Sequence, residues 1–392
     1  MKIAYILPDW PIPCFRGYQR IAFERIKRLA RRHEIDIFYF SQCGEDTSAH
    51  TPEALGCRAI HQVEFGRWRA RGNALLALLR GEPGQVGYYR SMAMKRRVTE
   101  EMRRHGYEAI VVQLVRLAQA MPTDLSGVRI LDMVDPLSLS YARSVYWRAW
   151  WSRWFYRLEA QRIERYEGRI AAFFDRVLLL SGDELKEYSR TVSKAKLAVV
   201  PYGVDLDYFR PSSEPRENGM VVLSGNLGYG PNVKAVDLFC RTIFPQVQRA
   251  VPDARLWLVG TDPHPRVRRW HNGKTVHVTG RVPELLPFLQ RAMVSVCPVL
   301  HRVGTQTKIL EALATATPVV AFTETAVGLV GDDRLPIQVA VTSSEFAQHV
   351  VRLLRGPSWA EISLQSRAYA ERYYSWDAST CLFETILSES IK

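Results

Sequence analysis

Residues Gly304–Phe322 have the sequence GTQTKILEALATATPVVAF, and the apolar run MVSVCPVL at Met293–Leu300 comes just before them. This order predicts a strand, a polar turn, a helix and a second strand at Pro318–Phe322, which is half of an α/β unit. Lys308 and Glu311 are three residues apart, so they share one face of the expected helix. The helix follows a Gly-Thr-Gln turn, where free backbone N–H groups and the positive end of the helix dipole favour a phosphate.

Length and composition limit the class of protein. A chain of 392 residues exceeds one typical core and predicts two domains. The six cysteines are scattered without C-x-x-C spacing, which argues against a zinc site and a disulfide framework and favours a reducing cytosol. The first apolar run is too short for a signal peptide, and no run has the length needed to span a bilayer. We therefore expect no metal and a cytoplasmic protein, soluble or peripheral on the cytoplasmic face of the membrane.

The positive charge belongs to the first half of the chain. Residues 1–200 contain 33 Lys and Arg against 22 Asp and Glu, whereas the rest contains 20 against 18. Such an asymmetry indicates an anionic partner: nucleic acid, an anionic membrane leaflet or a lipid diphosphate. Since no helix-turn-helix, zinc finger or other nucleic-acid module is present, we expect no nucleic-acid partner.

Hydrophobic patterning predicts two successive α/β sets. Strands at Lys2–Leu7 and Ile35–Phe40 flank a basic amphipathic helix around Tyr18–Arg32, an order that favours a parallel sheet. The segment Val199–Gly219 is rich in Pro, Gly, Ser and charge, which is typical of a linker. We predict an α/β fold with a Rossmann-like domain at 1–200, a linker at 201–218, a second Rossmann-like domain at 219–370 and a closing helix at 371–392.

Five ordered motifs carry a resemblance to a known family. They are VVPYGVDLDYF, LSGNLGYGPN, LWLVG, VTGRVPEL and GTQTKILEALATATPVV. Over roughly Ser181–Leu329 the chain resembles family-four retaining glycosyltransferases of the GT-B fold, in particular the subgroup associated with bacterial exopolysaccharide synthesis. The resemblance implies two Rossmann-like domains facing each other across a cleft, with the last helix returning to the first domain.

The resemblance also implies a reaction. A hexosyl unit would pass with retention from a nucleoside-diphosphate sugar, held by the second domain, to a hydroxyl acceptor on the first domain. No cofactor or metal is implied. The acceptor is either lipid-linked, as in polysaccharide or glycolipid assembly, or a soluble natural-product aglycone. An inactive transferase-like subunit of a membrane assembly complex and a nucleotide-sugar epimerase of the same fold are the alternatives.

The resemblance assigns roles within the opening segment. Glu311 corresponds to the carboxylate that accepts hydrogen bonds from the ribose hydroxyls, and Lys308 would neutralise the departing diphosphate. Gly304, Thr305 and Gln306 would offer backbone N–H groups to the phosphate or sugar. The alternatives are a solvated helix glutamate, a surface lysine and an ordinary helix cap by a threonine hydroxyl.

One position departs from the family pattern. The family has a second acidic residue eight positions before the ribose glutamate, near the donor sugar, and this chain has Val303 there. Valine accepts no hydrogen bond and stabilises no positive charge. The exopolysaccharide-associated subgroup also lacks this acid, so activity stays compatible with the sequence. Sugar specificity does not follow from this position.

Two further segments of the second half are candidates for the donor site. Gly225–Asn232, GNLGYGPN, lies between a strand and a helix, where glycines allow close approach to a phosphate. Within and after it, Gly225, Asn226 and Lys234 are candidate phosphate contacts, with a plain turn and a surface lysine as alternatives. The resemblance places the nucleotide base on the turn at Arg281 and Val282.

The first half offers fewer candidates. Asp132 and Asp135 follow a predicted strand, at the carboxyl-end edge where α/β proteins bind ligands. Either carboxylate would bind sugar hydroxyls or assist the acceptor hydroxyl, but Asp135 before Pro136 is equally suited to cap the next helix. Arg16 in the first β–α loop is a candidate for contact with the sugar or acceptor.

A tryptophan-rich segment follows these residues. Trp147, Trp150, Trp151 and Trp154 fall on one face if residues 141–174 form a single helix, with arginines around them. Trp and Arg beside an apolar stripe are typical of a helix that lies on a membrane surface. The alternative is an amphipathic helix packed on its own domain.

Overall fold

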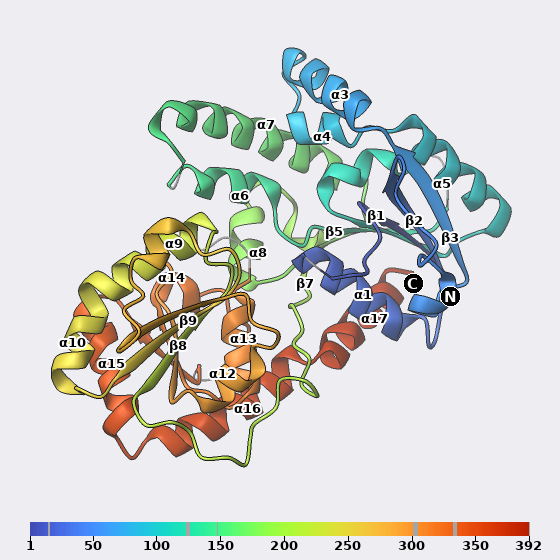
Figure 1. Cartoon of the computed structure of the whole chain (residues 1–392). Coiled ribbons are helices and arrows are strands. Elements are labelled where there is room, and N and C mark those ends of the chain that lie inside the picture. The colour runs from blue at the N-terminus through green and yellow to red at the C-terminus, as the bar shows by residue number, and fades with distance from the viewer. Residues whose placement is uncertain (15, 123–125, 147, 301–304, 332–334, 392) are drawn as a thin grey trace. The chain divides into compact units, whose positions relative to one another are not determined.

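The computed structural model describes residues 1–14, 16–122, 126–146, 148–300, 305–331 and 335–391. The chain divides into two compact units. Unit 1 contains Met1–Pro201 and Ser379–Lys392, and unit 2 contains Tyr202–Ala378. Each unit is a parallel sheet with helices on both faces (Figure 1).

Unit 1 contains a seven-stranded sheet in the order β3-β2-β1-β4-β5-β6-β7. Its strands are β1 (Lys2–Leu7), β2 (Glu34–Gln42), β3 (Ala59–Phe65), β4 (Ala109–Gln113), β5 (Val128–Asp132), β6 (Arg176–Leu179) and β7 (Leu197–Val199). Alternate residues of β1 enter opposite cores: Ala4 and Ile6 lie in one apolar cluster, Ile3 and Tyr5 in the other. A strand buried on both faces has to be apolar throughout, which is why β1 has a continuous hydrophobic sequence.

Helices cover both faces of this sheet. They are α1 (Gly17–Leu29), α2 (Pro52–Leu55), α3 (Arg67–Leu79), α4 (Gly84–Tyr88), α5 (Met92–His105), α6 (Leu137–Ser144), α7 (Arg153–Ala171), α8 (Gly182–Tyr188) and most of α17 (Trp376–Ile391). Three short 3₁₀ turns join them, at η1 (Val115–Ala120), η2 (Trp150–Ser152) and η3 (Lys194–Lys196). Phe383, Ile386 and Leu387 of α17 pack in the same cluster as Ile3 and Tyr5. The last helix therefore completes the core of the first sheet.

Unit 2 contains a six-stranded sheet in the order β10-β9-β8-β11-β12-β13. Its strands are β8 (Met220–Ser224), β9 (Arg255–Val259), β10 (Val276–Gly280), β11 (Val294–Cys297), β12 (Val319–Phe322) and β13 (Ile337–Ala340). Its helices are α9 (Gly230–Leu238), η4 (Phe239–Ile243), α10 (Phe244–Ala250), α11 (Pro265–Arg268), α12 (Leu286–Arg291), α13 (Thr307–Ala314), α14 (Thr323–Ala326), α15 (Ser343–Arg355) and α16 (Trp359–Tyr374). The predicted α/β class with two parallel sheets is confirmed.

Hydrophobic patterning of the sequence does not reveal β3, β7 or β13, and these are edge strands. β3 and β7 close the first sheet and β13 closes the second. An edge strand has less apolar cover, so its sequence loses the continuous hydrophobic run that marks a central strand. In β3, for example, exposed Gln62 and Glu64 alternate with buried residues.

The segment predicted as a linker belongs to unit 2. Val204 forms a parallel bridge with Ser375, and its N–H donates to the carbonyl oxygen of Tyr374 at 2.6 Å. The chain passes from unit 1 to unit 2 at Pro201 and returns at Ser379. Inside unit 1, the Ser379 hydroxyl donates to the carbonyl oxygen of Pro201 at 2.7 Å, so the two crossing points lie together.

The tryptophan-rich segment is not one helix, so that prediction was wrong. α6 ends at Ser144, and η2 separates it from α7, which begins at Arg153. The side chains of Trp150, Trp151 and Trp154 are all exposed, so these tryptophans are not packed on the domain. α7 does pack on unit 1, but through a different face that includes Ile163 and Ala171. Trp147 lies outside the described residues. Within the described part of the chain, no helix has the length and apolarity needed to cross a membrane.

Candidate functional site

The loop after β8 is built against the end of β9. The N–H of Gly225 donates to the carbonyl oxygen of Val259 at 3.0 Å, and the N–H of Leu227 donates to the carbonyl oxygen of Thr261 at 2.9 Å. A Cβ atom on Gly260 would lie 1.6 Å from the carbonyl oxygen of Gly225, an impossible distance for any side chain. Glycine at position 260 therefore permits the two backbones to touch.

Asn226 shapes this loop. Its side-chain oxygen accepts hydrogen bonds from the N–H groups of Gly228 at 2.9 Å and Tyr229 at 3.1 Å. Its backbone carbonyl accepts one from the amide of Asn232 at 2.8 Å. The structure thus commits the Asn226 side-chain oxygen to the turn, an Asx turn of the usual kind.

Lys308 joins the loop to α13. Its ammonium donates to the side-chain oxygen of Asn232 at 2.7 Å and lies 3.3 Å from the point where a Cβ on Gly225 would be. Burial lowers the pKa of Lys308, while the nearby Cys297 thiol and Glu311 carboxylate act in the opposite direction. Because the amide is neutral, this hydrogen bond leaves the positive charge uncancelled. The alternative of a surface lysine is wrong.

Glu311 lies one turn further along α13 and is half-buried. Its carboxylate acts electrostatically on Lys308 and also on Tyr208, whose pKa is raised by burial first and then by Glu284 and Glu311. The Glu311 carboxylate is half-buried beside a half-buried lysine, near the carboxyl ends of the strands. Such a carboxylate is suited to accept hydrogen bonds from a polar ligand.

The turn before α13 is described from Thr305 onward. Gln306 is the residue that precedes the first helical position, and the N–H of Ile309 donates to its carbonyl at 2.9 Å. The Thr305 hydroxyl is buried, and it has no hydrogen-bond partner in the described part of the chain. The alternative of a cap by the Thr305 hydroxyl is therefore wrong. Gly304 and Val303 lie outside the described residues.

The remaining candidates of unit 2 occupy separate positions. Lys234 is exposed on α9, two residues after Asn232. Arg281 follows β10 and is exposed, whereas Val282 is half-buried against the apolar cluster beneath α13. The structure thus brings Gly225, Asn232 and Lys308 together and leaves Lys234 on the surface.

Asp132 is a structural residue of unit 1, which corrects the prediction of a catalytic carboxylate. Asp132 and Arg25 are each 1% exposed, and they form an ion pair of 2.5 Å. The Arg25 guanidinium also lies over the ring of Phe383, 4.8 Å from its centroid. A carboxylate sealed in the core and paired with a buried cation is not accessible to a substrate.

The start of α6 is capped by a residue of α7. One carboxylate oxygen of Glu167 accepts hydrogen bonds from the N–H groups of Leu137 at 2.8 Å and Ser138 at 3.2 Å. The Ser138 hydroxyl donates to the other oxygen. Glu167 is fully buried, and burial raises its pKa from 4.5 to about 7. Asp135 itself is half-buried just before the helix.

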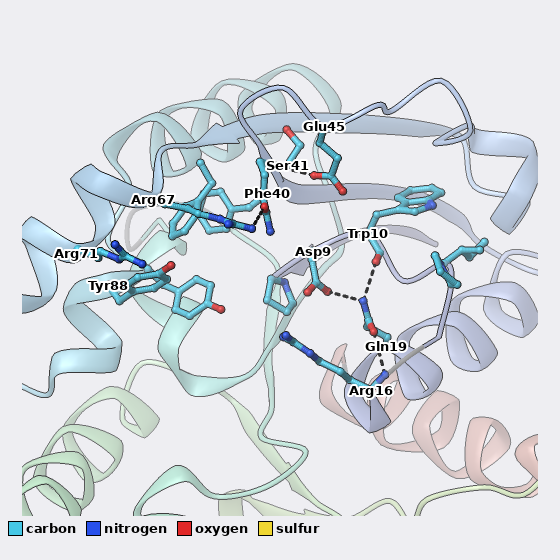
Figure 2. Close-up of a pocket in the computed structure, with 16 residues that line it drawn as sticks. Asp9, Trp10, Arg16, Gln19, Phe40, Ser41, Glu45, Arg67, Arg71 and Tyr88 are labelled. Carbon is cyan, nitrogen blue, oxygen red and sulfur yellow. Dashed lines mark hydrogen bonds between the residues drawn. The ribbon is translucent and has the colours of Figure 1, made fainter. Parts of the chain in front are cut away.

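A pocket of about 520 Å³ opens at the carboxyl ends of β1 and β2 in unit 1 (Figure 2). Arg16 lines it, and the Arg16 guanidinium donates to the Tyr18 hydroxyl at 2.8 Å. Tyr18 in turn donates to the Asp9 carboxylate at 2.7 Å, and the Gln19 amide donates to the same carboxylate at 3.3 Å. Burial raises the pKa of Asp9. A carboxylate and a guanidinium are thus held at one pocket wall.

The opposite wall of the pocket comes from elements that lie far from Arg16 in the sequence. Arg67 and Arg71 of α3 and Tyr88 of α4 line the pocket, with Phe40 and Ser41 of β2 between the two walls (Figure 2). Asp9 carried a usable signal, since an acidic residue two positions after the first strand lies at the ligand-binding edge. No sequence signal connects Arg67 and Arg71 with this pocket, because their position depends on β3, which the hydrophobic pattern does not reveal.

Comparisons with known proteins agree with this architecture. Residues 218–356 match the family model described as Glycosyl transferases group 1. Among solved structures, sucrose-phosphate synthase from Thermosynechococcus elongatus is similar at 16% identity, with 99% of this chain and 98% of that chain covered and a TM-score of 0.71. Among curated proteins, none matches the sequence.

Two further solved structures share the fold over their whole length. HepE from Anabaena, in complex with UDP and glucose, is similar at 14% identity, with 99% and 100% of the two chains covered and a TM-score of 0.67. A glycosyltransferase from Rickettsia africae is similar at 12% identity, with coverage of 100% and 98% and a TM-score of 0.63. The coarser part of the predicted resemblance is confirmed: residues 218–356 match the glycosyl transferases group 1 model, and the chain has the GT-B fold. The exopolysaccharide-associated subgroup and the retaining mechanism stay predictions.

Proposed function

We propose that this protein transfers a sugar unit from a nucleoside-diphosphate sugar to a hydroxyl acceptor. The observation that carries the proposal is the position of Lys308. Its ammonium is half-buried, bonded to a neutral amide and packed beside the loop glycine Gly225. A cation placed beside a glycine loop and at the first turn of a helix offers a diphosphate both charge and room to approach.

The rest of the donor follows from this anchor. With the diphosphate at Lys308, Glu311 lies one turn away and accepts hydrogen bonds from the ribose hydroxyls. The backbone N–H groups around Thr305 and Gln306 meet a phosphate or the sugar, and the turn at Arg281 and Val282 holds the base. The match of residues 218–356 to the family model supports this placement.

The chemistry is electrostatic. The bond between the anomeric carbon and the diphosphate oxygen breaks, and its electron pair leaves with the diphosphate, whose growing charge Lys308 and the N-terminus of α13 offset. The acceptor hydroxyl attacks the same face, and its proton passes to the departing phosphate oxygen. We therefore propose retention at the anomeric carbon without a bound metal or cofactor.

The acceptor binds in the unit 1 pocket. Asp9 and Arg16 offer a hydrogen-bond acceptor and a cationic donor on one wall, suited to sugar hydroxyls or a phosphate. We propose a role in polysaccharide or glycolipid assembly on the cytoplasmic side of a membrane.

A donor panel tests the proposal. The protein is incubated separately with UDP-, GDP- and dTDP-sugars, and both the melting temperature and the release of free nucleoside diphosphate are measured. One nucleotide class should raise the melting temperature and be hydrolysed slowly in the absence of acceptor. If no nucleotide sugar raises the melting temperature and every donor stays intact, the enzymatic function is wrong.

A further inference from the structure

Helix α3 exposes most of its large apolar side chains and buries two alanines. Trp68, Leu75 and Leu79 follow the i, i+7, i+11 spacing of one helical face, with Leu76 beside them. Trp68 is 82% exposed and Leu79 is 77% exposed. An ordinary packed helix has the reverse arrangement, since burying large apolar groups is what stabilises its packing.

The buried face of α3 explains why the helix keeps this orientation. Ala70 and Ala77 are buried, and Ala77 packs against Gly87 of α4 so closely that a Cβ at Gly87 would lie 2.3 Å from the alanine methyl. α3 and α4 therefore pack closely against each other through small residues. The pair fixes Trp68 and Leu79 outward, so their exposure is a property of the fold.

The charged side chains of α3 itself are all positive. The segment Arg67–Arg80 contains four arginines and no acidic residue. The guanidinium of Arg71 lies over the indole of Trp68, 5.0 Å from the ring centroid. This arrangement places the charge directly at the edge of the apolar stripe.

The start of α7 repeats the pattern. Trp150, Trp151 and Trp154 are exposed, with Trp150 at 80%. The segment 145–158 contains three arginines and no acidic residue. α4 connects the two regions, because the N–H of Gly84 at its start donates to the Glu159 carboxylate of α7 at 3.0 Å.

We propose that these exposed side chains form one docking surface for an anionic lipid bilayer. The α3–α7 surface is defined as Trp68, Leu75, Leu76, Leu79, Trp150, Trp151 and Trp154. Its indole and leucine side chains enter the boundary between headgroups and acyl chains, and the flanking arginines bind the negative headgroups.

Charge decides between a bilayer and a second copy of the chain. In a symmetric dimer this surface would face itself, which would bring arginines against arginines with no acidic residue from either segment between them. An anionic leaflet complements both the apolar stripe and its arginine border. The bilayer is therefore the occupant that the residues favour.

Docking has a consequence for the pocket of unit 1. Arg67 and Arg71 line that pocket from the helix that carries Trp68 and Leu79. With α3 on the leaflet, the pocket rim lies at headgroup level, where a lipid-anchored acceptor presents its phosphate and first sugars. This last step rests on the proposed function, whereas the docking surface does not.

Sedimentation with vesicles tests the surface. The full chain is mixed with sucrose-loaded vesicles of phosphatidylcholine, with or without phosphatidylglycerol, and the bound fraction is measured at low and high salt. We expect binding to the anionic vesicles, weakened by salt. The double variants Trp68→Glu with Leu79→Glu and Trp150→Glu with Trp154→Glu should each lower the partition coefficient about tenfold.

Leu364→Glu is the control, because Leu364 is 74% exposed on α16 of unit 2 and belongs to neither arginine-rich segment. This variant should sediment like the parent chain. All variants should keep the parent melting temperature and its nucleotide-induced shift, which separates failure of docking from failure of the donor site.

Two results would overturn the inference. The first is equal binding of parent and both double variants to anionic vesicles, or no binding by the parent chain. The second is self-association in light scattering that the α3 and α7 variants abolish without any effect on lipid, which would make this surface an interface between copies.

Discussion

Lys308 has two neighbours that decide its chemistry, the neutral Asn232 amide and the loop glycine Gly225. Replacing Lys308 by Met keeps an unbranched side chain in the same space and removes the charge. We expect affinity for a nucleoside diphosphate to fall about 10- to 100-fold, because a charged hydrogen bond is lost. Affinity for the matching nucleoside should stay the same, and titration calorimetry measures both.

Lys274→Met is the control for this variant, since Lys274 is exposed on the turn before β10. An equal loss of nucleoside and nucleoside-diphosphate affinity in Lys308→Met would show that the substitution disturbs the loop, and that Lys308 does not bind the diphosphate.

Glu311 gives a complementary prediction at the other end of the nucleotide. In Glu311→Ala we expect the nucleoside to bind about tenfold more weakly, because the acceptor for the ribose hydroxyls is gone. The melting temperature without ligand should change little, since the side chain is only half-buried. Glu324→Ala, on the exposed first turn of α14, should bind like the parent. Unchanged affinity in Glu311→Ala would remove the residue from the donor site.

Residues in local motifs were predictable, and residues placed by tertiary contacts were not. Gly225 and Lys308 stand at strand and helix ends, where chain order alone indicates the ligand edge. Asp132 stands at such an end too, yet it pairs with Arg25, which is 107 residues away in sequence. No sequence pattern around Asp132 indicates that Arg25 is its partner. From the sequence alone, the carboxylate therefore looked free to bind a substrate.

At the scale of elements, Glu167 makes the start of α6 sensitive to pH. Burial raises the Glu167 pKa from 4.5 to about 7. Between these values the folded chain keeps a proton that the unfolded chain has lost, so stability falls as pH rises from 4.5 to 7 and stays lowered above 7. The shift corresponds to about 3 kcal/mol.

Glu167→Gln should remove this dependence. The amide oxygen still accepts from the N–H groups of Leu137 and Ser138, and no charge has to be buried. We expect the variant to melt at a higher temperature than the parent at pH 8 and at a similar temperature at pH 5, measured by calorimetry. Parallel pH profiles for parent and variant would exclude Glu167 as the source.

The ends of β8 and β9 give a second prediction at this scale. Gly260→Ala places a methyl group on the Gly225 carbonyl, so the loop has to move or unit 2 unfolds. We expect a loss of more than about 3 kcal/mol in the free energy of unfolding, with loss of nucleotide binding. Gly182→Ala is the control, because a Cβ there meets no atom within 4 Å. Denaturant titration compares the two, and equal midpoints would contradict the close contact.

Strands that are buried on both faces were easier to predict than the edge strands β3, β7 and β13. β1 and β8 are buried on both faces, so their hydrophobic runs are continuous, and the predicted bounds of β1 agree with the structure. The edges β3, β7 and β13 lack this signal. The tryptophan-rich segment failed for another reason: helical spacing of the tryptophans says nothing about the break between α6 and α7.

At the scale of the whole molecule, ligand effects should divide between the units. A nucleoside diphosphate should slow amide hydrogen exchange in the loop after β8 and in α13, both in unit 2. Peptides of unit 1 around β1 and α3 should exchange at the same rate with and without nucleotide. Mass spectrometry of peptic peptides measures both. Protection confined to unit 1 would contradict the placement of the donor site.

Helix α17 has a consequence for the order in which the protein acquires its structure during synthesis. Phe383 and Leu387 are fully buried in the core of unit 1, beside Ile3 and Tyr5 from the first strand. The ribosome completes unit 2 before it makes these residues, so unit 2 has its entire sequence earlier. The apolar groove of the first sheet therefore stays unfilled during synthesis until residues of α17 emerge from the ribosome. A chain that is truncated before α17 leaves this groove exposed, so it should bind chaperones or aggregate.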